Sequence, residues 1–518
     1  MEYVLTAAEM QECDRRTIEE HKMDSLVLME RAAYGMAEEI RKRKPEPARV
    51  LIVSGTGNNG GDGLAAGRML WQSGYEVTFY LAGAREKCSV SCKRQIEILE
   101  SHGISLKMDE TDQGILKQNE YDIIVDALFG IGLKREINGR LAELVHIINQ
   151  KDAFVAACDI PSGISADTGQ IRGCAVKADL TVTFAWKKRG QLLYPGAGYT
   201  GELCCVQMGI TEHSFWKDFR PAALTYDRTD LSRLPAREPD GNKGSFGKVL
   251  LVAGSPNMAG AAFLSAKSCY RTGAGLVRIF TAEENRLILQ SIVPEAVLHT
   301  YARKPQGLDE EDIEGLLQDL HWADCVILGP GIGTDVMAGS LVRTVLNDTE
   351  LKKKVCVLDA DALNLIAVDP EKQQLLKQRA AESQVIMTPH LLEFSRLTGR
   401  KIEKLREDII TNVSEYAKEM QTTVVCKDAR SIVVESYGSV YINASGNDAL
   451  ATAGSGDVLT GIIGGLAAQG LEAYQAAALG TYIHGLSGET AAECRSRYSV
   501  MAGDLPEALG KVLGTGSG

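Results

Sequence analysis

The sequence has no long uninterrupted apolar segment and no excess of positive charge, and each absence excludes a class of protein. No stretch reaches the roughly 18 uncharged apolar residues that a transmembrane helix requires, so we expect no membrane association. The first residues, Met1-Glu2-Tyr3-Val4, lack the basic region and apolar run of a secretory signal. This predicts a cytoplasmic protein. The net charge of −12 argues against nucleic acid as a partner, because phosphate contacts need clustered Lys and Arg.

Cysteine is present, but not in the patterns that hold metals or form disulfide frameworks. None of the twelve cysteines stands in a C-x-x-C pair, and most lie in apolar strand-like runs, such as Cys158, Cys325, Cys356 and Cys426. We therefore expect reduced cysteines that pack in the core.

The length of 518 residues exceeds the usual size of one domain. Short β-branched runs alternate with amphipathic stretches, which is typical of α/β units with parallel sheets. A polar segment at 215–242 contains Pro221, Pro235 and Pro239 and predicts the domain junction. The predicted domains are residues 1–220 and 225–518. Residues 1–44 are predicted to form helices ahead of the first strand.

Eleven strands and one hairpin are predicted from these runs. In the first half the strands are expected at 50–53, 77–81, 123–126, 154–160 and 180–185. In the second half they are expected at 248–253, 277–280, 325–328, 355–358, 385–387 and 423–426, followed by a hairpin of 431–435 and 439–443.

A glycine-rich loop, Ser54-Gly55-Thr56-Gly57-Asn58-Asn59-Gly60-Gly61-Asp62-Gly63, follows the first of these strands. Gly55, Gly57 and Gly60 satisfy G-x-G-x-x-G, but the next strand ends at 79–83 without the carboxylate that a dinucleotide-binding Rossmann fingerprint requires. The loop is therefore predicted to bind phosphate or sugar through its backbone in a different arrangement. The alternative is a tight strand-to-helix turn.

Two carboxylates follow later strands, at the edge where open α/β sheets place ligands. Asp126 precedes Ala127-Leu128-Phe129-Gly130-Ile131-Gly132, and Asp159 precedes Ile160-Pro161-Ser162-Gly163. Such positions are typical of catalytic groups, although an Asp can also serve there as a helix cap or turn residue.

Asn58-Asn59-Gly60-Gly61-Asp62-Gly63 together with Asp159-Ile160-Pro161-Ser162-Gly163 resembles the NAD(P)H-hydrate epimerase domain over about residues 1–212. The resemblance implies a Rossmann-like three-layer α/β/α domain. It also implies a potassium ion held by Asn59, Asp126 and Ser162, whose oxygen donors suit a hard cation. It implies contacts to the nicotinamide hydrate from Asn58, Asn59, Gly60, Gly61, Asp62, Gly130, Ile131, Gly132, Leu133, Lys134, Arg135, Glu136 and Asp159.

Epimerisation at the hydroxylated ring carbon needs proton transfer, which opens or dehydrates that centre and re-forms it from the other face. Asp159 is the candidate acid/base, and Lys134 is the candidate cationic group. A non-enzymatic alternative is a binding module, since the same fold also serves in RNA-decapping scaffolds. The retained Asp159 and the set Asn59, Asp126 and Ser162 disfavour it.

In the second half, Ala453-Gly454-Ser455-Gly456-Asp457 opens an apolar, glycine-rich helix. Backbone N–H groups at such a helix start can stabilise a phosphoryl group. Asp457 beside them can accept a proton from a substrate hydroxyl, as in ribokinase-type kinases. The alternative is a buried helix with a flexible glycine start, which leaves Asp457 unexplained.

Further polar or glycine-rich segments accompany this helix. The segment 243–248 is not a Walker A loop, because Val249 follows Lys248. His390 follows Thr388-Pro389 after a strand; a lone His is commonly structural, yet this position favours ligand contact. The other segments are Gly260-Ala261-Ala262, Gly329-Pro330-Gly331-Ile332-Gly333 and Asp359-Ala360-Asp361.

Together these segments resemble the ADP/ATP-dependent NAD(P)H-hydrate dehydratase family, of ribokinase-like α/β fold, over about residues 225–510. The resemblance implies hydrate contacts from Ala261, Gly331, His390 and Asp457. It implies nucleotide contacts from Lys427, Asp428, Ala429, Arg430, Ser431, Gly454, Ser455 and Gly456, although family members often have a glycine at 428 or 429.

The two resemblances together imply that the chain is a bifunctional repair enzyme for hydrated NADH and NADPH (NADHX and NADPHX). One domain would epimerise the R and S hydrates. The other would phosphorylate the hydroxyl of the S epimer with ADP or ATP and Mg²⁺, so that phosphate leaves and NAD(P)H and AMP or ADP are released. Dehydratase relatives favour a homo-oligomer. The alternative is a ribokinase-like small-molecule kinase with an accessory nucleotide-binding domain, which would yield a stable phosphorylated product.

Overall fold

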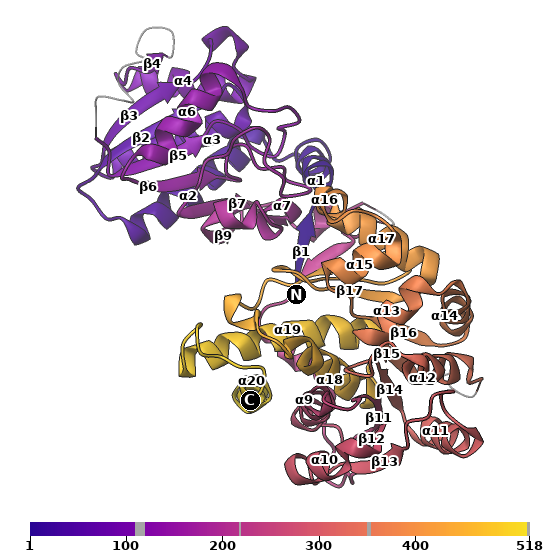
Figure 1. Cartoon of the computed structure of the whole chain (residues 1–518). Coiled ribbons are helices and arrows are strands. Elements are labelled where there is room, and N and C mark those ends of the chain that lie inside the picture. The colour runs from indigo at the N-terminus through magenta and orange to yellow at the C-terminus, as the bar shows by residue number, and fades with distance from the viewer. Residues whose placement is uncertain (109–119, 217–218, 350–353, 515–518) are drawn as a thin grey trace. The chain divides into compact units, whose positions relative to one another are not determined.

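The computed structural model describes residues 1–108, 120–216, 219–349 and 354–514. The chain forms two compact units, which divide between Ala223 and Leu224. We call residues 2–223 the N-terminal unit and residues 224–518 the C-terminal unit (Figure 1).

The N-terminal unit alternates strands and helices along most of its length. Its elements are β1 (Glu2–Leu5), α1 (Ala7–Glu19), α2 (Ser25–Arg43), β2 (Arg49–Ser54), α3 (Asn58–Gln72), β3 (Glu76–Leu81), α4 (Val90–Ser101), β4 (Lys107–Met108), β5 (Ile123–Ala127), α6 (Gly139–Gln150), β6 (Phe154–Cys158), β7 (Leu180–Phe184), β8 (Lys187–Lys188), α7 (Arg189–Leu192), α8 (Ala197–Thr200) and β9 (Glu202–Val206).

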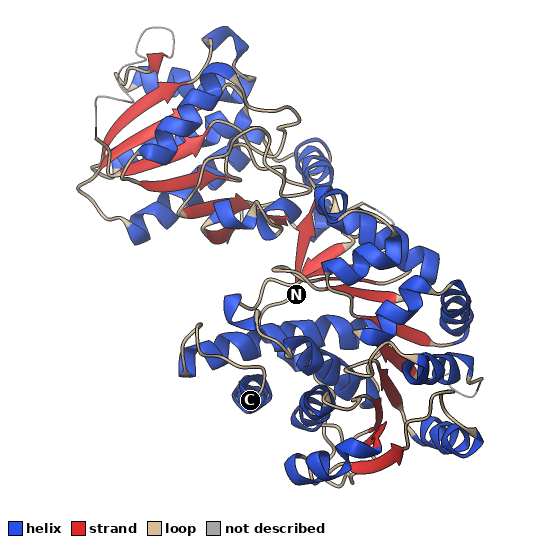
Figure 2. Cartoon of the chain, in the orientation of Figure 1, coloured by secondary structure: helices blue, strands red, loops and turns tan. Residues whose placement is uncertain are grey.

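The main sheet of this unit is parallel and doubly wound. Its strand order is β4-β3-β2-β5-β6-β7-β9, so the winding reverses between β2 and β5. Helices cover both faces, as Figure 2 shows. Since side chains alternate along a strand, Val50 and Ile52 pack into one buried cluster, and Leu51 and Val53 pack into another. The reversal leaves a crevice at the carboxyl ends of β2 and β5, where such sheets bind ligands.

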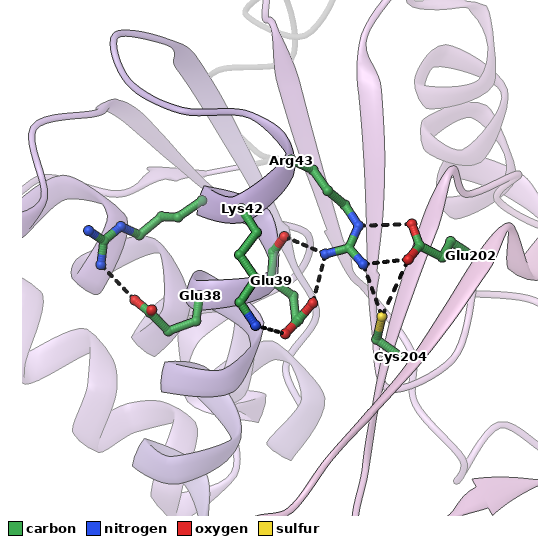
Figure 3. Close-up of polar contacts among 7 residues, drawn as sticks. Glu38, Glu39, Lys42, Arg43, Glu202 and Cys204 are labelled. Carbon is green, nitrogen blue, oxygen red and sulfur yellow. Dashed lines mark hydrogen bonds and ion pairs between the residues drawn. The ribbon is translucent and has the colours of Figure 1, made fainter. Parts of the chain in front are cut away.

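A polar cluster ties the end of α2 to the edge strand β9 (Figure 3). The Arg43 guanidinium donates from Nε and Nη2 to the two carboxylate oxygens of Glu202, at 2.9 and 2.5 Å. It also donates to Glu39 on the preceding turn, at 2.7 Å. Because Glu202 is largely exposed, these ion pairs contribute little to stability; they fix where the helix lies on the sheet.

The C-terminal unit repeats the pattern with longer helical segments. Its elements are β11 (Lys248–Val252), α9 (Ala259–Arg271), β12 (Leu276–Ala282), α10 (Arg286–Ile292), β13 (Val297–Tyr301), α11 (Glu310–Trp322), β14 (Cys325–Leu328), α12 (Val336–Asn347), β15 (Val355–Leu358), α13 (Asp361–Val368), α14 (Pro370–Glu382), β16 (Gln384–Met387), α15 (Leu391–Thr398), α16 (Ile402–Glu407), α17 (Ile409–Met420), β17 (Thr423–Cys426), β18 (Ile432–Val434), β19 (Val440–Ile442), α18 (Ser455–Ala468), α19 (Ala473–Cys494) and α20 (Asp504–Gly514), and β10 (Ala223–Thr225) spans the division between the units.

Within the C-terminal unit the strands follow the order β13-β12-β11-β14-β15-β16-β17-β18-β19. The strands from β13 to β17 are parallel, and β18 and β19 add an antiparallel hairpin. The winding reverses between β11 and β14. Helix α18 packs against α9 and against β14 on one face of the sheet, which brings its N-terminus to the same edge as this reversal.

Most predicted strands are confirmed within one or two residues, and the predicted hairpin is confirmed. Two expectations were wrong in detail. A short strand, β1, precedes the helices of residues 1–44. The strand predicted to reach residue 160 ends at Cys158, because Asp159 takes a φ of +64°, which a β-strand does not accommodate.

The twelve cysteines are all free thiols, as expected, and Cys494 is the exposed one. Among the described residues, no helix is both long enough and apolar enough to cross a bilayer.

Candidate functional site

The crevice of the N-terminal unit holds a cavity of about 660 Å³. Its walls come from α1, from the loop between β2 and α3, from the loop after β5 and from the ends of β6 and β8. The predicted hydrate contacts that line it are Asn58, Asn59, Asp62, Gly130, Ile131, Gly132, Leu133, Lys134, Arg135 and Asp159. Gly60 and Gly61 are buried behind this surface, and Glu136 is exposed one residue beyond it.

The glycines of the β2–α3 loop serve two different purposes. A Cβ on Gly55 would lie 2.0 Å from the carbonyl oxygen of Leu128, and one on Gly60 would lie 1.9 Å from that of Gly55. Backbone packing therefore requires both. Nothing lies within 4 Å of the Cβ position of Gly57, which lines the cavity. The middle glycine leaves room for a ligand at the N-terminus of α3, where backbone N–H groups attract anions.

Asp159 stands at the floor of this cavity in a constrained backbone conformation. Its φ of +64° lies in the left-handed region, which Asp adopts more readily than most residues. The turn is held by the Ile160 N–H, which donates to the Cys158 carbonyl at 2.8 Å. The Gln191 side chain also donates to the Asp159 carbonyl at 2.6 Å. Strained residues of this kind are concentrated at active sites.

The partner of the Asp159 carboxylate is Lys188. Its Nζ lies 2.6 Å from Oδ1 of Asp159 and donates also to the Thr183 hydroxyl at 2.8 Å and the Phe184 carbonyl at 3.0 Å. Only 1% of the Lys188 side chain is exposed. A buried cation with three oxygen partners holds the neighbouring carboxylate in place.

Sequence reasoning missed Lys188 and named Lys134 as the cationic group. Lys134 lines the same cavity with an exposed side chain. Lys187 and Lys188 form the two-residue strand β8 after β7. Trp186 and Lys187 are both half-buried and only Lys188 is buried, so no local pattern marks Lys188.

Two more carboxyls face the cavity. Asp62 projects from α3 and Asp14 from α1. Burial, the negative charge of Asp159 and that of Asp14 raise the pKa of Asp62 well above its usual value. Burial also raises the pKa of Asp14. The cavity therefore holds carboxyls that differ in how readily they lose a proton.

The three predicted potassium ligands lie next to the cavity. The Ser162 hydroxyl donates to Asp126 Oδ1 at 2.6 Å, and the Ser162 N–H donates to Oδ2 at 2.8 Å. Burial raises the pKa of Asp126 to about 6. The Asn59 amide is buried with no hydrogen-bond partner for its nitrogen among the described residues. A carboxylate, a hydroxyl and an uncommitted amide are oxygen-rich groups that suit a hard monovalent cation.

In the C-terminal unit, Ala261 and Gly331 meet at the winding reversal. The N–H groups of Gly254 and Ser255, after β11, donate to the carbonyls of Pro330 and Gly331, after β14, at 2.9 and 2.6 Å. Gly331 has a φ of +62°, and a Cβ there would lie 3.0 Å from that of Ala261. Two predicted hydrate contacts are thus brought together.

The N-terminus of α18 supplies the predicted anion-binding turn. Gly454, at φ +90°, precedes the helix, and Ser455, Gly456 and Asp457 form its first turn. Burial, with the negative charge of Asp359, raises the pKa of Asp457 to about 7. A carboxyl with this pKa, in the first turn of a helix, is suited to accept a proton near neutral pH.

A buried ion pair lies beside Asp457. Lys427 Nζ is 2.8 Å from Asp359 Oδ1, and the Thr460 hydroxyl, one turn into α18, donates to Asp359 Oδ2 at 2.6 Å. A Cβ on Gly456 would lie 3.3 Å from Lys427 Nζ. Lys427 is therefore next to the anion-binding turn, as the predicted nucleotide contact requires.

His390 begins α15 and accepts from the Glu393 N–H through Nδ1 at 3.1 Å, while Glu393 accepts from the His390 N–H at 2.8 Å. Burial raises the pKa of Glu393 to about 7. His390 thus has a structural role as a helix cap, and its ring is half-exposed with Nε2 3.3 Å from Glu393 Oε1. Contact with a ligand stays a prediction. Sequence reasoning missed Glu393 as an electrostatic neighbour of Lys427.

The remaining predicted nucleotide contacts form the turn between β17 and β18. The Lys427 N–H donates to the Pro389 carbonyl at 2.8 Å, which aligns this turn with the His390 segment. Arg430 donates to the Ala444 carbonyl at 2.8 Å, and Ser431 lies beside Asp428. Asp428 and Ala429 are exposed.

Each half of the chain thus carries an acid next to backbone N–H groups at the reversal of a doubly wound sheet, which defines a two-site α/β enzyme acting on phosphate-bearing substrates. Residues 25–190 match the family described as YjeF-related protein N-terminus, and residues 249–511 match NAD(P)H-hydrate dehydratase. The chain belongs to the family of bifunctional NAD(P)H-hydrate repair enzymes, which combine an epimerase domain with a dehydratase domain.

Relatives of this kind match nearly the whole chain. The bifunctional NAD(P)H-hydrate repair enzyme of Moorella thermoacetica is 37% identical, covering 99% of this chain and 96% of its own length. That of Thermofilum pendens is 35% identical, covering 98% and 96%. Among solved structures, the ADP/ATP-dependent NAD(P)H-hydrate dehydratase from Bacillus subtilis, crystallised with ATP and Mg²⁺, is 28% identical. It covers 56% of this chain and 98% of its own, with a TM-score of 0.48.

Proposed function

We propose that residues 1–220 form the epimerase domain and residues 225–518 the dehydratase domain. The first would interconvert the R and S forms of hydrated NADH and NADPH. The second would return the S form to NAD(P)H with a nucleotide as phosphoryl donor. The observation that carries this proposal is that each unit places one acid, Asp159 or Asp457, beside helix N–H groups at its own sheet reversal.

In the epimerase cavity, the phosphates of the hydrated dinucleotide would lie against the α3 N-terminus near Gly57. The carbinolamine carbon would then face Asp159. Because Lys188 pairs with its carboxylate, Asp159 can accept the hydroxyl proton and return it after the ring has re-formed from the other face.

We propose that K⁺ binds at Asn59, Asp126 and Ser162. A buried carboxylate is costly without a compensating charge, and the side-chain oxygens of Asn59 and Ser162 are the kind of ligand that a hard cation takes. The ion would neutralise the charge of Asp126 and hold the loop after β6 against the end of β5. The prediction is that K⁺ raises the thermal midpoint of the N-terminal unit more than Na⁺ does, and that Asp126→Asn removes the difference.

In the dehydratase, hydroxide is a poor leaving group, so the hydroxyl must first be converted to a phosphate ester. Asp457 would accept the hydroxyl proton while the oxygen attacks the terminal phosphoryl group of ADP or ATP. The N–H groups of Ser455 and Gly456 and the Lys427 ammonium would carry the transferring charge. The ring nitrogen's lone pair then expels phosphate and restores the dihydropyridine. Mg²⁺ bound with the nucleotide would supply further charge neutralisation.

The test uses the full chain with hydrated NADH, Mg²⁺ and either ADP or ATP. The absorbance of reduced nicotinamide should return, with free phosphate released. Asp457→Asn should abolish that return and leave epimerisation intact. A stable phosphorylated product without regenerated NADH would instead support the small-molecule kinase. ADP as the preferred donor, a cytoplasmic location and a homo-oligomeric state remain predictions.

A further inference from the structure

Two carboxyls face the epimerase cavity with opposite surroundings. Asp159 accepts from the buried Lys188 ammonium and from the Thr183 hydroxyl at 3.0 Å. Asp62 lines the same cavity from α3 and makes no hydrogen bond or ion pair with any other residue in the described part of the chain. One carboxyl is therefore held by a buried cation and a hydroxyl, whereas the other faces the cavity uncommitted.

The groups around Asp62 disfavour a second negative charge. Asp159 follows β6, and Asp14 projects from α1; both repel an ionised Asp62, and Lys188 offsets them only in part. The thiols of Cys92 on α4 and Cys158 on β6 are the other titratable neighbours, and burial raises the pKa of both. Burial and these like charges therefore favour the protonated form of Asp62.

We propose that Asp62 is the second catalytic residue of the epimerase, a protonated acid that works opposite the Asp159 carboxylate. The proposal rests on the proposed epimerase function and adds the group that protonates the ring nitrogen. Pairs of acids whose surroundings separate their proton affinities are the usual arrangement when one group must donate while the other accepts.

The proton transfers then balance without any external reactant. Asp159 accepts the hydroxyl proton as the bond between the ring nitrogen and the hydroxylated carbon breaks. The electron pair goes to the nitrogen, which receives the proton of Asp62, and the carbon becomes an aldehyde. After rotation about the adjacent single bond, the nitrogen attacks the other face of the aldehyde. Asp62 regains the nitrogen's proton, and the proton on Asp159 returns to the oxygen. Both acids end each turnover as they began it.

The test measures interconversion of the purified R and S hydrates by the full chain, with dehydration of the S hydrate in the same preparations as an internal control. Asp62→Asn keeps the size of the side chain and removes its proton-donating ability. It should lower kcat for epimerisation by about 10²- to 10⁴-fold, the range typical of a general acid, with KM changed less than about threefold. Asp62→Glu should restore part of kcat. Asp152→Asn removes an exposed carboxyl that does not line the cavity; it is the control and should stay within about threefold of wild type.

A second measurement does not depend on an inactive variant. In the wild-type protein at neutral pH, infrared difference spectroscopy should detect the carbonyl stretch of a protonated carboxyl that disappears in Asp62→Asn. An Asp62→Asn protein that epimerises at more than a third of the wild-type rate would overturn the role of Asp62. If Asp159→Asn were inactive in the same assays, the proposed function would still stand. If both variants were fully active, the epimerase site itself would be misplaced.

Discussion

Lys188 Nζ lies 2.6 Å from Asp159 Oδ1, with only 1% of the lysine side chain exposed. The pair places a fixed positive charge behind a carboxylate whose own backbone is held in the left-handed region. Lys188 is a positioning residue, since it acts on the substrate through Asp159.

Replacement of Lys188 by Met should therefore lower the rate of epimerisation. Without the ammonium, the Asp159 carboxylate loses the buried partner that orients it, so kcat should drop by at least tenfold while KM changes less than about threefold. The matched control is Lys187→Met, which removes a partly exposed lysine that pairs with Glu2. A wild-type kcat in Lys188→Met would contradict this role.

Dehydration should depend on pH through Asp457. Burial and the neighbouring Asp359 raise the pKa of Asp457 to about 7, and a base must be deprotonated to act. The value of kcat/KM for the S hydrate should rise about tenfold per pH unit below 7 and level off above it. The epimerisation rate of the same chain supplies the control, since its profile should not follow this curve. A flat dehydration profile between pH 5 and 8 would argue against Asp457 as the base.

The ion pair of Lys427 and Asp359 should matter for stability. Loss of one partner leaves the other charge buried, which costs about 3–5 kcal/mol; Asp359 has 1% of its side chain exposed. Lys427→Met should lower the free energy of unfolding of the C-terminal unit by this order, as measured in urea. Lys377→Met breaks an exposed pair with Glu419 and should cost less than about 1 kcal/mol.

Because Lys427 also lowers the pKa of Asp457, Lys427→Met should shift the dehydration profile towards higher pH. Loss of stability without that shift would mean that Lys427 has only a structural role.

Two alanine substitutions in the β2–α3 loop should separate packing from ligand binding. In Gly60→Ala the new Cβ would lie 1.9 Å from a backbone oxygen, so the N-terminal unit should lose about 1–3 kcal/mol of stability. In Gly57→Ala the Cβ meets no protein atom within 4 Å. That variant should keep its stability within about 1 kcal/mol and raise KM for the hydrate. Equal destabilisation of both would contradict the assignment of Gly57 to the ligand side.

Much of the fold was predictable because β-branched runs and turn residues are local signals. The strand at Cys325–Leu328 was predicted to the residue. The places of Asp159 and Asp457 in the fold were also predictable, since Asp159 follows the strand β6 and Asp457 lies in the first turn of α18. Lys188 was not predictable, because it is buried through its contact with Asp159, which lies 29 residues earlier in the chain. That contact forms only when β7 and β8 are in place. Strand β1 was missed since four residues before a helix cap carry too little periodicity.

The left-handed backbone of Asp159 has a consequence for how its chemistry is dissected. Asparagine tolerates this conformation nearly as well as aspartate. Alanine has no polar side chain that can bond locally, and the left-handed conformation costs it about 1–2 kcal/mol. An alanine variant would thus disturb the turn after β6 and also remove the carboxylate. Its inactivity could then result from either change. Asparagine is the substitution that isolates the proton transfer.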